Sequence, residues 1–390
     1  MIASKNMENK RKICIIVNSR ANYGRIKTVL IALKSHPKII LQLIVGASAV
    51  LQRFGDVREI IENDGFSITN VVYSVIEGEN PTTMAKSTGL AIIELSTIFE
   101  NLKPDVVLTV ADRYETLATA VAASYMNIPL AHTQGGEVTG SIDESVRHAI
   151  TKLAHIHFPS TRLAKSNLIK LGEDPKTIHM TGCPAMDIAA NTELSIDEQF
   201  FKRYKGVGPG IDPSKPYLVV LQHPVTTEFG KGFDQIKETI KAVSSLNIQV
   251  VWLWPNIDAG SDDVSKGIRT FRERERPKNI HFYKNFSPED FIKLIGNCLC
   301  QIGNSSSAIR EGSFLGVPAV NIGTRQSGRE CGENVVHVDY KSEEILNAIN
   351  FQLNHGNYQK SDIFGKGNTG KLIAEILANA KLKIQKRLHF

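Results

Sequence analysis

The stretch DVVLTVADRYE, residues 105–115, joins a short apolar run to a polar turn, and the segment Thr116–Ala123 that follows has a helical pattern. A continuous apolar run between helical segments is typical of a parallel strand that helices cover on both faces. The same alternation continues on both sides of this stretch from residue 12 onward. It indicates repeated βαβ units and an α/β fold.

Candidate strands fall into two groups along the chain. The first group is Ile13–Val17, Leu41–Val45, Asp105–Val110, Leu130–Thr133 and His155–Phe158. The pattern breaks after Gly182–Asp187, and a polar stretch rich in Gly and Pro follows, as is typical of a linker. It restarts with the second group: Tyr217–Gln222, Gln249–Trp254, Ile280–Tyr283, Cys298–Ile302 and Ala319–Ile322. The sequence therefore predicts two sheets.

We expect two Rossmann-like, doubly wound parallel-sheet domains that face a cleft. The expected organisation is a polar lead at 1–11, an N-terminal α/β domain at 12–187, a linker region at 188–215, a C-terminal α/β domain at 216–367 and a bracing helix at 368–390. Ligands of such sheets bind beyond the carboxyl ends of the strands. A ligand site shared by both domains is therefore expected.

The composition is that of a globular protein. Hydrophobic residues make up 42% and charged residues 22% of the chain, which excludes disorder as the main state. No apolar run reaches the roughly 20 residues that span a bilayer, and residues 1–12 lack the apolar centre of a signal peptide. We therefore expect a cytoplasmic protein without membrane contact.

The net charge fits a small anionic ligand as well as a nucleic acid, so the pattern of the charges has to distinguish the two. Lys plus Arg exceed Asp plus Glu by 46 − 40 = 6, and the two signs are interspersed, as in Arg272–Arg276. Nucleic-acid binding is not expected, because a basic stripe is missing from the sequence. The five cysteines lack paired CxxC spacing, so we interpret them as reduced packing residues and predict no metal site.

Polar residues gather where predicted strands end, which is where ligands of parallel sheets bind. Five such clusters stand out: Asn18–Gly24; Ala111–Glu115; His132–Glu137 with Ser141–His148; His223–Thr227 with Trp254–Gly260; and Gly303–Glu311 with Gly323–Gln326. The third cluster is the densest in carboxylate, His and Arg side chains.

Each cluster has a functional and a structural interpretation. Arg20 either clamps a phosphate or lies solvated on a surface turn, and Asp112 either acts as a base or caps the next helix. Asp143 and Arg147 are four residues apart on one helical face and are expected to pair toward the cleft. His223 either contacts a ligand or is a satisfied structural histidine. The hydroxyls of Ser305–Ser307 either face a pyrophosphate or form a ligand-free N-cap.

Three motif-based alternatives are excluded. Residues 365–371 have P-loop spacing, but Leu372 replaces the required Ser or Thr and no strand precedes them. No G-x-S-x-G elbow is present, which argues against a serine hydrolase. No G-x-G-x-x-G follows the first strand, which argues against a nicotinamide-dependent dehydrogenase.

The segments that contain these clusters resemble the hydrolysing UDP-N-acetylglucosamine 2-epimerases. The resemblance extends from about residue 12 to the C-terminus. The matching segments are Ser19–Gly24, Asp112–Glu115, His132–Glu137, Asp143–Leu153, Gln222–Thr227, Pro255–Ser261, Gly303–Glu311 and Gly323–Glu330, and the string from Arg147 to His155 makes the match specific. That family includes bacterial sialic-acid and legionaminic-acid pathway enzymes and the epimerase half of the animal bifunctional epimerase/kinase. The resemblance implies the glycosyltransferase-B fold, with UDP mainly on the C-terminal domain.

The resemblance also implies roles for individual residues. Ser305 and Ser306 would hold phosphate, and Glu311 would accept hydrogen bonds from the ribose hydroxyls. The diphosphate side would be completed by Arg20, Gly24, Arg113, His223, Asn256 and Arg325. The sugar would face Asp112, Gln134, Glu137, Asp143 and Arg147. Asn22 and Gln134 stand where relatives often carry acidic residues, so acid/base roles fall to the remaining carboxylates.

The implied reaction converts UDP-GlcNAc and water into ManNAc and UDP, for sialic-acid-type synthesis, through a 2-acetamidoglucal. Asp112 and Asp143 would be the principal acid/base pair, with Glu137, Arg147 and His223 completing the catalytic set. No metal or other cofactor enters this scheme. Binding across the cleft implies closure about a hinge.

Three alternatives remain open at this stage. The substrate of the legionaminic-acid branch, UDP-2,4-diacetamido-2,4,6-trideoxyglucose, would use the same loops. A non-hydrolysing epimerase would return UDP-ManNAc, although Asp112–Arg113 and Gly135–Glu137 favour the hydrolysing branch. A non-catalytic nucleotide-sugar-binding protein would need no carboxylates around the sugar. By resemblance we expect a homodimer or homotetramer.

Overall fold

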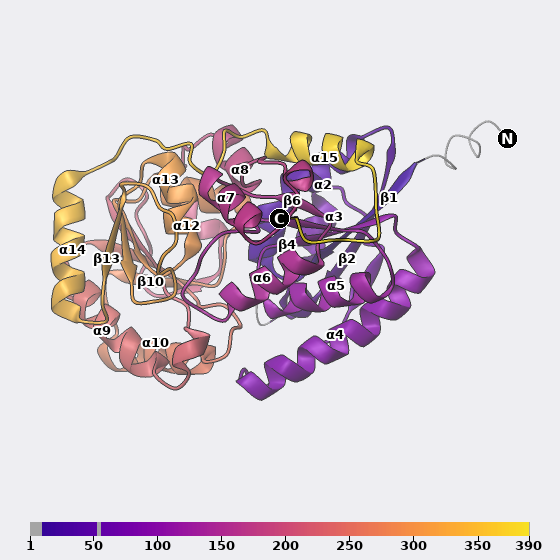
Figure 1. Ribbon diagram of the computed structural model, residues 1–390. Coiled ribbons are helices and arrows are strands. Elements are labelled where there is room, and N and C mark those ends of the chain that lie inside the picture. The colour runs from indigo at the N-terminus through magenta and orange to yellow at the C-terminus, as the bar shows by residue number, and fades with distance from the viewer. Residues whose placement is uncertain (1–9, 53–55, 390) are drawn as a thin grey trace.

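The computed structural model describes residues 10–52 and 56–389. It consists of two α/β halves, and Figure 1 shows them side by side, the N-terminal half in indigo and purple and the C-terminal half in pink and orange. Each half is built around one sheet with helices on both faces. Among the described residues, none of the helices combines the length and apolarity that crossing a membrane requires.

The N-terminal sheet is entirely parallel and has the strand order β3-β2-β1-β4-β5-β6. Its strands are β1 (Arg11–Val17), β2 (Ile39–Gly46), β3 (Asn70–Val72), β4 (Val106–Val110), β5 (Leu130–Thr133) and β6 (Ile156–Phe158). The helices are α2 (Arg20–Ser35), α3 (Arg58–Asn63), α4 (Pro81–Leu102), α5 (Tyr114–Tyr125), α6 (Asp143–Leu153), α7 (Arg162–Lys170) and α8 (Ala185–Asn191). This strand order is that of a doubly wound fold. Strands β2 and β3 are added on one side of β1, and β4, β5 and β6 are added on its other side, so the strand order reverses between β1 and β4.

The C-terminal sheet repeats this plan, with the order β13-β12-β11-β8-β9-β10-β7. Its strands are β7 (Gly206–Val207), β8 (Tyr217–Leu221), β9 (Gln249–Leu253), β10 (Ile280–Tyr283), β11 (Cys300–Gly303), β12 (Ala319–Ile322) and β13 (Val335–Val338). The helices are α9 (Gly232–Ser244), α10 (Ser261–Glu275), α11 (Pro288–Gly296), α12 (Ser306–Ile309), α13 (Glu311–Leu315), α14 (Ser342–His355) and α15 (Thr369–Asn379). The strand order reverses between β8 and β11. Among the described residues, the antiparallel edge strand β7 is the only strand that has no counterpart in the N-terminal sheet.

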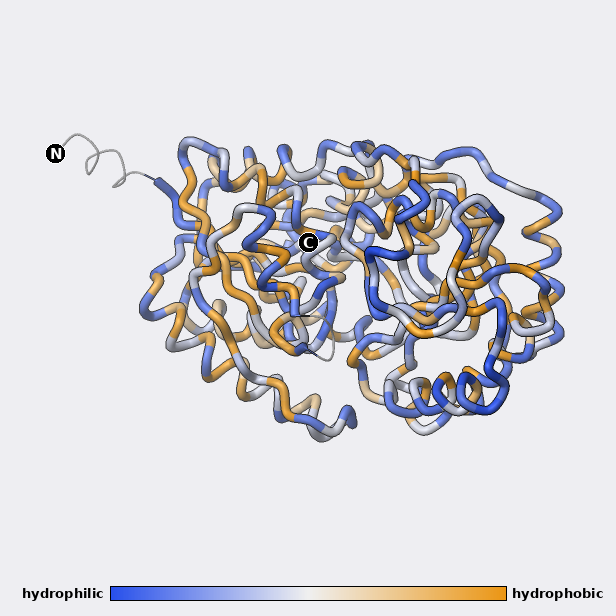
Figure 2. Tube along the Cα trace, turned by 180° about the vertical axis from the view of Figure 1, so that it is seen from behind, coloured by the Kyte–Doolittle hydropathy of each residue, from blue (hydrophilic) through white to orange (hydrophobic). Residues whose placement is uncertain are grey.

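Apolar side chains fill both faces of each sheet. In the N-terminal half, one cluster lies between the sheet and α2 and another lies under α4, α5 and α6. The C-terminal half has equivalent clusters around Trp252 and around Phe200. Figure 2 shows the hydrophobic segments running through the middle of each half, whereas the exposed helix α10 is largely hydrophilic.

All the strands expected from the sequence are present, with ends shifted by at most a few residues. The sequence analysis missed three short edge strands, β3, β7 and β13. None of these carries a continuous buried apolar run, because all of their residues except Val72 are partly or fully exposed. The expected two-sheet α/β fold is confirmed, whereas the domain boundaries stay a prediction.

The expected C-terminal helix is shorter than the sequence suggested. Helix α15 ends at Asn379, and residues 380–389 continue without helical structure. In Figure 1 α15, in yellow, returns to the N-terminal half, where it lies beside α2. Ile373 and Leu377 are fully buried in the cluster around β1 and α2, and each contributes about 1.5–3 kcal/mol to stability.

Candidate active site

A pocket lies between the two halves, beyond the carboxyl ends of the strands at which each sheet reverses direction. It has a volume of about 280 Å³. Residues after β1 and β4 line it from one side, and residues after β8, β9, β11 and β12 line it from the other. This is the position at which doubly wound sheets bind ligands.

Most residues expected at the site line this pocket. They are Arg20, Gly24, Asp112, Arg113, Asp143, His223, Asn256, Ser305, Ser306, Glu311 and Arg325. The pocket lining does not include Gln134, Glu137 and Arg147, so the contact of these three side chains with the sugar stays a prediction.

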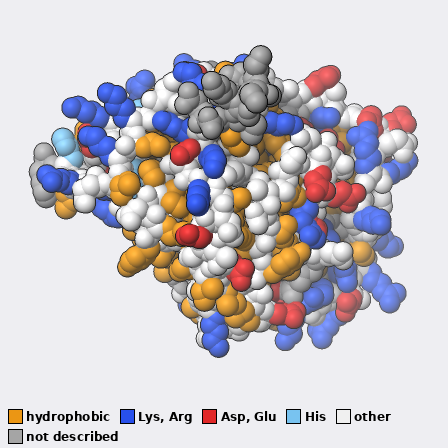
Figure 3. Space-filling model, turned by 90° about the vertical axis from the view of Figure 1, so that its right-hand side faces the viewer, with side chains coloured by type: hydrophobic (Ala, Val, Ile, Leu, Met, Phe, Trp, Pro, Cys, Tyr) orange, Lys and Arg blue, Asp and Glu red, His pale blue; other side chains and the backbone are white. Residues whose placement is uncertain are grey.

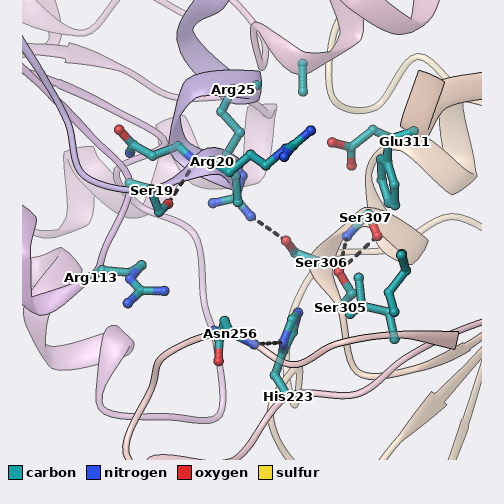
Figure 4. Close-up of a pocket in the computed structure, with 18 of the residues that line it drawn as sticks. Ser19, Arg20, Arg25, Arg113, His223, Asn256, Ser305, Ser306, Ser307 and Glu311 are labelled. Carbon is teal, nitrogen blue, oxygen red and sulfur yellow. Dashed lines mark hydrogen bonds between the residues drawn. The ribbon is translucent and has the colours of Figure 1, made fainter. Parts of the chain in front are cut away.

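Arg20 and Arg25 lie near one another at the pocket, and Arg113 lies apart from them (Figure 4). Ser19 caps α2 by accepting a hydrogen bond from the Asn22 backbone N–H at 3.0 Å, and Arg20 is the first residue of that helix. Arg25 lies one turn later and donates from Nη2 to the Ser306 hydroxyl of the other half at 2.6 Å. The buried Nε of Arg20 has no protein partner, which suits binding of an anion.

Two further arginines are held by one buried carboxylate. Asp258 lies 3.1 Å from Nη2 of Arg113 and 3.6 Å from Nη2 of Arg325, so it joins one arginine from each half. Burial alone would raise the pKa of Asp258, but the two guanidinium groups outweigh it and lower the pKa. Asp258 thus fixes both arginines at the edge of the pocket.

His223 is held in one tautomer by the backbone. Its Nδ1 accepts a hydrogen bond from the Asn256 backbone N–H at 3.1 Å, so the ring proton resides on Nε2. Burial and the nearby Arg325 lower the pKa of His223 to about 3, so the ring is neutral near pH 7. A neutral imidazole with Nε2–H donates a hydrogen bond to an anion, but it has no proton to spare as an acid.

The hydroxyl cluster after β11 precedes a helix of only four residues, α12. Ser305 caps α12 through its contact with the Ser307 backbone N–H at 3.3 Å, but α12 ends at Ile309 and a break at Arg310 separates it from α13. A single turn has little macrodipole. An anion here depends on hydroxyls and arginines more than on a helix end.

Glu311 begins α13 and lies deep in the pocket wall. Its Oε2 is buried without a protein partner, and burial raises the pKa of its carboxyl group. A buried acceptor without a partner is costly unless a ligand donates to it. The position therefore suits hydroxyl groups of a ligand.

Two carboxylates, Asp112 and Asp143, enter the pocket from the N-terminal half. Asp112 forms an ion pair with Arg147, whose side chain is fully buried. Burial and the facing Asp258 raise the pKa of Asp143, in spite of the opposite effect of Arg325 and Arg113. One carboxylate is thus held by a cation, whereas the other can exchange a proton closer to neutral pH.

The expected pair between Asp143 and Arg147 does not form. Arg147 instead contacts Asp112 and, at 3.1 Å, Glu144. Arg147 lies on the buried face of α6 and reaches the end of β4, whereas Asp143 at the helix start turns into the pocket. Helical spacing alone could not reveal the partner on another element.

The backbone is strained on both sides of this carboxylate pair. Ala111, directly before Asp112, has φ 65°, and Gln134 has φ 62°, which are left-handed values unusual for residues other than glycine. The ring of His132 lies 2.8 Å from the Ala111 carbonyl oxygen and donates to it from Nε2. The fold therefore fixes the turn that presents Asp112.

Sequence reasoning gave no role to Arg25, Asp258 and Arg329, which lie at or beside the pocket. Arg25 lies inside a helix and therefore outside the strand-end rule, although its spacing from Arg20 could have indicated it. Asp258 and Arg329 both stood in quoted segments without a role. No group of His, Cys, Asp or Glu in the described ranges is arranged to hold a metal ion.

Comparisons with known proteins agree with this geometry. A family model described as UDP-N-acetylglucosamine 2-epimerase matches residues 31–378. The chain is 33% identical to the UDP-N,N'-diacetylbacillosamine 2-epimerase (hydrolyzing) of Legionella pneumophila, with 96% of this chain and 97% of that protein covered. It is 31% identical to the UDP-N-acetylglucosamine 2-epimerase of Neisseria meningitidis, with 95% of each covered.

Solved structures show the same fold. The UDP-GlcNAc 2-epimerase from Neisseria meningitidis bound to UDP-GlcNAc matches with a TM-score of 0.76 at 19% identity, covering 94% of this chain and 99% of that chain. The Methanocaldococcus jannaschii UDP-GlcNAc 2-epimerase in complex with UDP-GlcNAc and UDP matches with a TM-score of 0.77 at 20% identity and the same coverage. The two facing sheets are thus a glycosyltransferase-B fold.

Proposed function

The chain belongs to the UDP-N-acetylglucosamine 2-epimerase family, and from that premise we propose that it is a hydrolysing enzyme that converts UDP-GlcNAc and water into ManNAc and UDP. One observation carries the proposal: the pocket between the halves is lined by the carboxylates of Asp112 and Asp143, and also by arginines of both halves together with the hydroxyls of Ser305–Ser307. The first set suits removal of a proton from a sugar carbon, and the second suits a departing diphosphate.

The nucleotide binds mainly to the C-terminal half in this proposal. Ser305 and Ser306 donate to phosphate oxygens, and Glu311 accepts from the ribose hydroxyls through its unpartnered Oε2. Arg20, Arg113 and Arg325 neutralise the diphosphate, and His223 donates to it from Nε2. Each of these groups lines the pocket, and their convergence from both halves lets binding draw the halves together.

The first chemical step is an elimination. Asp143 takes the proton from C2, the electron pair of that C–H bond forms the C1–C2 double bond, and the C1–O bond breaks with both electrons leaving on UDP. The C2 proton is weakly acidic, so a carboxylate with a raised pKa is the better base. The arginines stabilise the negative charge that grows on the diphosphate.

The second step adds water to the resulting 2-acetamidoglucal. A carboxylate on the wall takes a proton from water as its oxygen bonds to C1, and a proton is delivered to C2 on the opposite face. The product is the free manno sugar. Asp112, held by Arg147, is the second member of this acid/base pair. Glu137 takes no part in proton transfer in this proposal, because Arg310 and Arg329 hold its carboxylate.

A second candidate substrate is UDP-2,4-diacetamido-2,4,6-trideoxyglucose. The relative that is 33% identical over almost the whole chain is named for UDP-N,N'-diacetylbacillosamine. The two sugars differ at C4 and C6, away from the bonds that react. The proposed product would feed synthesis of a sialic-acid-type or legionaminic-acid-type sugar accordingly. A cytoplasmic location and a homodimer or homotetramer stay predictions.

A time course followed by NMR, with each sugar nucleotide in turn, tests this proposal. We expect UDP and a free manno-configured sugar to appear together from at least one of the two substrates. Accumulation of a UDP-linked manno sugar would show a non-hydrolysing epimerase instead. Binding of UDP without turnover of either substrate would favour a non-catalytic nucleotide-sugar-binding protein.

A further inference from the structure

Glu137 forms a buried ion cluster that crosses between the two halves. Its Oε2 accepts hydrogen bonds from Nη2 of Arg310 and, at 2.5 Å, from Nη2 of Arg329, both of the C-terminal half. The three side chains are 5%, 1% and 4% exposed, respectively. A carboxylate buried to this degree is costly without its cations, so the cluster forms fully only when the halves meet.

The same residue also supports the proposed acid/base pair. The backbone carbonyl of Glu137 accepts a hydrogen bond from Nη1 of Arg147 at 2.8 Å. The other nitrogen of that guanidinium, Nη2, pairs with Asp112. Glu137 is therefore separated from Asp112 by a single side chain.

On the opposite side, the cluster continues toward the proposed phosphate site. Arg329 donates from Nη1 to the Gln326 side chain at 2.7 Å, and Gln326 donates to the Asn304 carbonyl oxygen at 2.9 Å. The Asn304 side chain accepts from the His223 backbone N–H at 2.7 Å. A continuous chain of polar contacts thus joins Glu137 to His223.

A second contact between the halves lies three residues beyond Glu137. The Gly140 backbone N–H donates to the Arg325 carbonyl oxygen at 3.1 Å. A Cβ atom at Gly140 would lie 1.8 Å from the Thr324 carbonyl oxygen, so no side chain fits while the halves are closed. The backbone of Gly140 is not in the left-handed region, so alanine is allowed there by the local conformation.

The charge state of Glu137 separates its role from that of an acid or base. Burial would raise the pKa of Glu137, but Arg310 and Arg329 outweigh it and lower the pKa to about 2. The carboxylate is therefore ionised throughout the neutral range. It holds cations and does not shuttle protons.

We infer that Glu137 is a positioning residue that couples closure of the two halves to alignment of Asp112 with the diphosphate site. This inference rests on the proposed function. In the closed molecule, the segment 137–140 contacts the segment 324–329. These contacts continue to the acid/base pair through Arg147 and to His223 through Asn304. Without them, the acid/base pair and the diphosphate site are not held in alignment.

Small-angle X-ray scattering with and without saturating UDP, combined with turnover of UDP-GlcNAc, tests this inference. The variants are Glu137→Gln, which removes the charge, and Gly140→Ala, which blocks contact with Thr324. Glu289→Gln is the matched control, because Glu289 also pairs across the halves, with Lys27 at 2.7 Å, but is 40% exposed. Thermal unfolding shows whether each variant is folded.

We expect UDP to compact the wild type and Glu289→Gln, but not Glu137→Gln or Gly140→Ala. In both test variants, kcat should fall by about 100-fold, a larger factor than the rise in the Kd for UDP, since the reacting groups are misaligned. If Glu137→Gln does not fold, Gly140→Ala alone decides. Wild-type compaction in a folded test variant, or an absence of compaction in the wild type, would overturn the inference.

These outcomes are distinct from failure of the proposed function. If the wild type turns over neither UDP-GlcNAc nor its 2,4-diacetamido analogue, the proposed function fails, whereas compaction by UDP still tests the closure on its own. If turnover occurs and Glu137→Gln keeps both wild-type kcat and wild-type compaction, the function stands and the role of Glu137 is refuted.

Discussion

Asp112 and Asp143 enter the same pocket, but they have different electrostatic surroundings. The first is paired with the buried Arg147, and the second faces the carboxylate of Asp258. Two carboxylates whose environments differ in this way are suited to different acid/base tasks. The sequence identified both aspartates as candidates, but only the structure shows that their electrostatic surroundings differ.

Replacing Asp143 by Asn should lower kcat by about 100- to 10,000-fold, because the amide cannot take the C2 proton. The measurement is UDP release from the preferred substrate in a coupled assay. Asp262→Asn is the control, since Asp262 is an exposed acidic residue in the first turn of α10. Full turnover by Asp143→Asn would refute its assignment as the base.

The pH dependence of kcat/KM should also report Asp143. The base acts only when it is deprotonated, so activity should fall as the pH drops through its pKa. Because that pKa is raised, the acidic limb should lie above the value of about 3.9 for a free aspartate. A profile flat down to pH 4 would contradict this expectation.

At the scale of elements, the tail after α15 contacts the helix that carries Asp143. Lys386 donates from Nζ to the carbonyl oxygens of Thr151 and Ala154, at 2.9 and 2.7 Å, and pairs with the buried Glu173 at 2.5 Å. A cation at the C-terminal end of a helix is stabilising, and here it also neutralises a buried carboxylate. The tail is thus a C-terminal cap for α6.

Lys386→Ala should lower the free energy of unfolding by about 1–2 kcal/mol, because the last carbonyls of α6 lose their cation and Glu173 keeps Lys152 as its remaining lysine partner. Chemical denaturation provides the measurement. Lys383→Ala, an exposed position in the same tail, serves as the control and should change stability little. Equal stabilities of the two variants would show that the tail does not cap α6.

Most elements could be predicted because long buried strands leave a clear apolar pattern. The exposed β7 and β13 leave none, and the helix after Asn368 ends early because residues 380–389 are held by contacts with α6 and Gly172 rather than by helical bonds. The candidate site residues at strand ends could be predicted because the apolar pattern shows where each buried strand stops. The partners of Glu137 and Arg147 could not be predicted, because these buried partners belong to distant segments.

At the scale of the molecule, the strand order of each sheet reverses at the edge that faces the other half, and the pocket lies between these two edges. Over the face of the N-terminal half seen in Figure 3, basic side chains lie next to acidic ones and no continuous basic stripe is formed. The concentrated positive charge lies instead inside the molecule, at the pocket. Its field therefore acts on a ligand between the halves.

Buried neutral histidines should make the whole fold sensitive to acid. The pKa values of His132 and His223 are lowered to about 3, mainly by burial, against about 6.5 in the unfolded chain. Their contribution to stability is therefore present above pH 6.5 and is lost as the pH falls toward 3. Between pH 7 and pH 5, each should cost on the order of 2 kcal/mol.

Denaturant unfolding at both pH values measures this loss, and His132→Gln should reduce it by about 2 kcal/mol, the contribution of that one ring. Glu137 and Glu173, whose pKa values are lowered to about 2, add a further loss only below about pH 4.3. Equal stability at pH 7 and pH 5 would contradict the assignment of neutral buried rings.

The most direct test of the account is a crystal structure of Asp143→Asn with the UDP-sugar that the wild type consumes. We predict that the sugar C2 lies within about 3.5 Å of the carboxyl group of Asp112 or the amide at position 143, with the diphosphate among Arg20, Arg113 and Arg325. A sugar ring whose C1 and C2 lie away from both side chains would contradict the account.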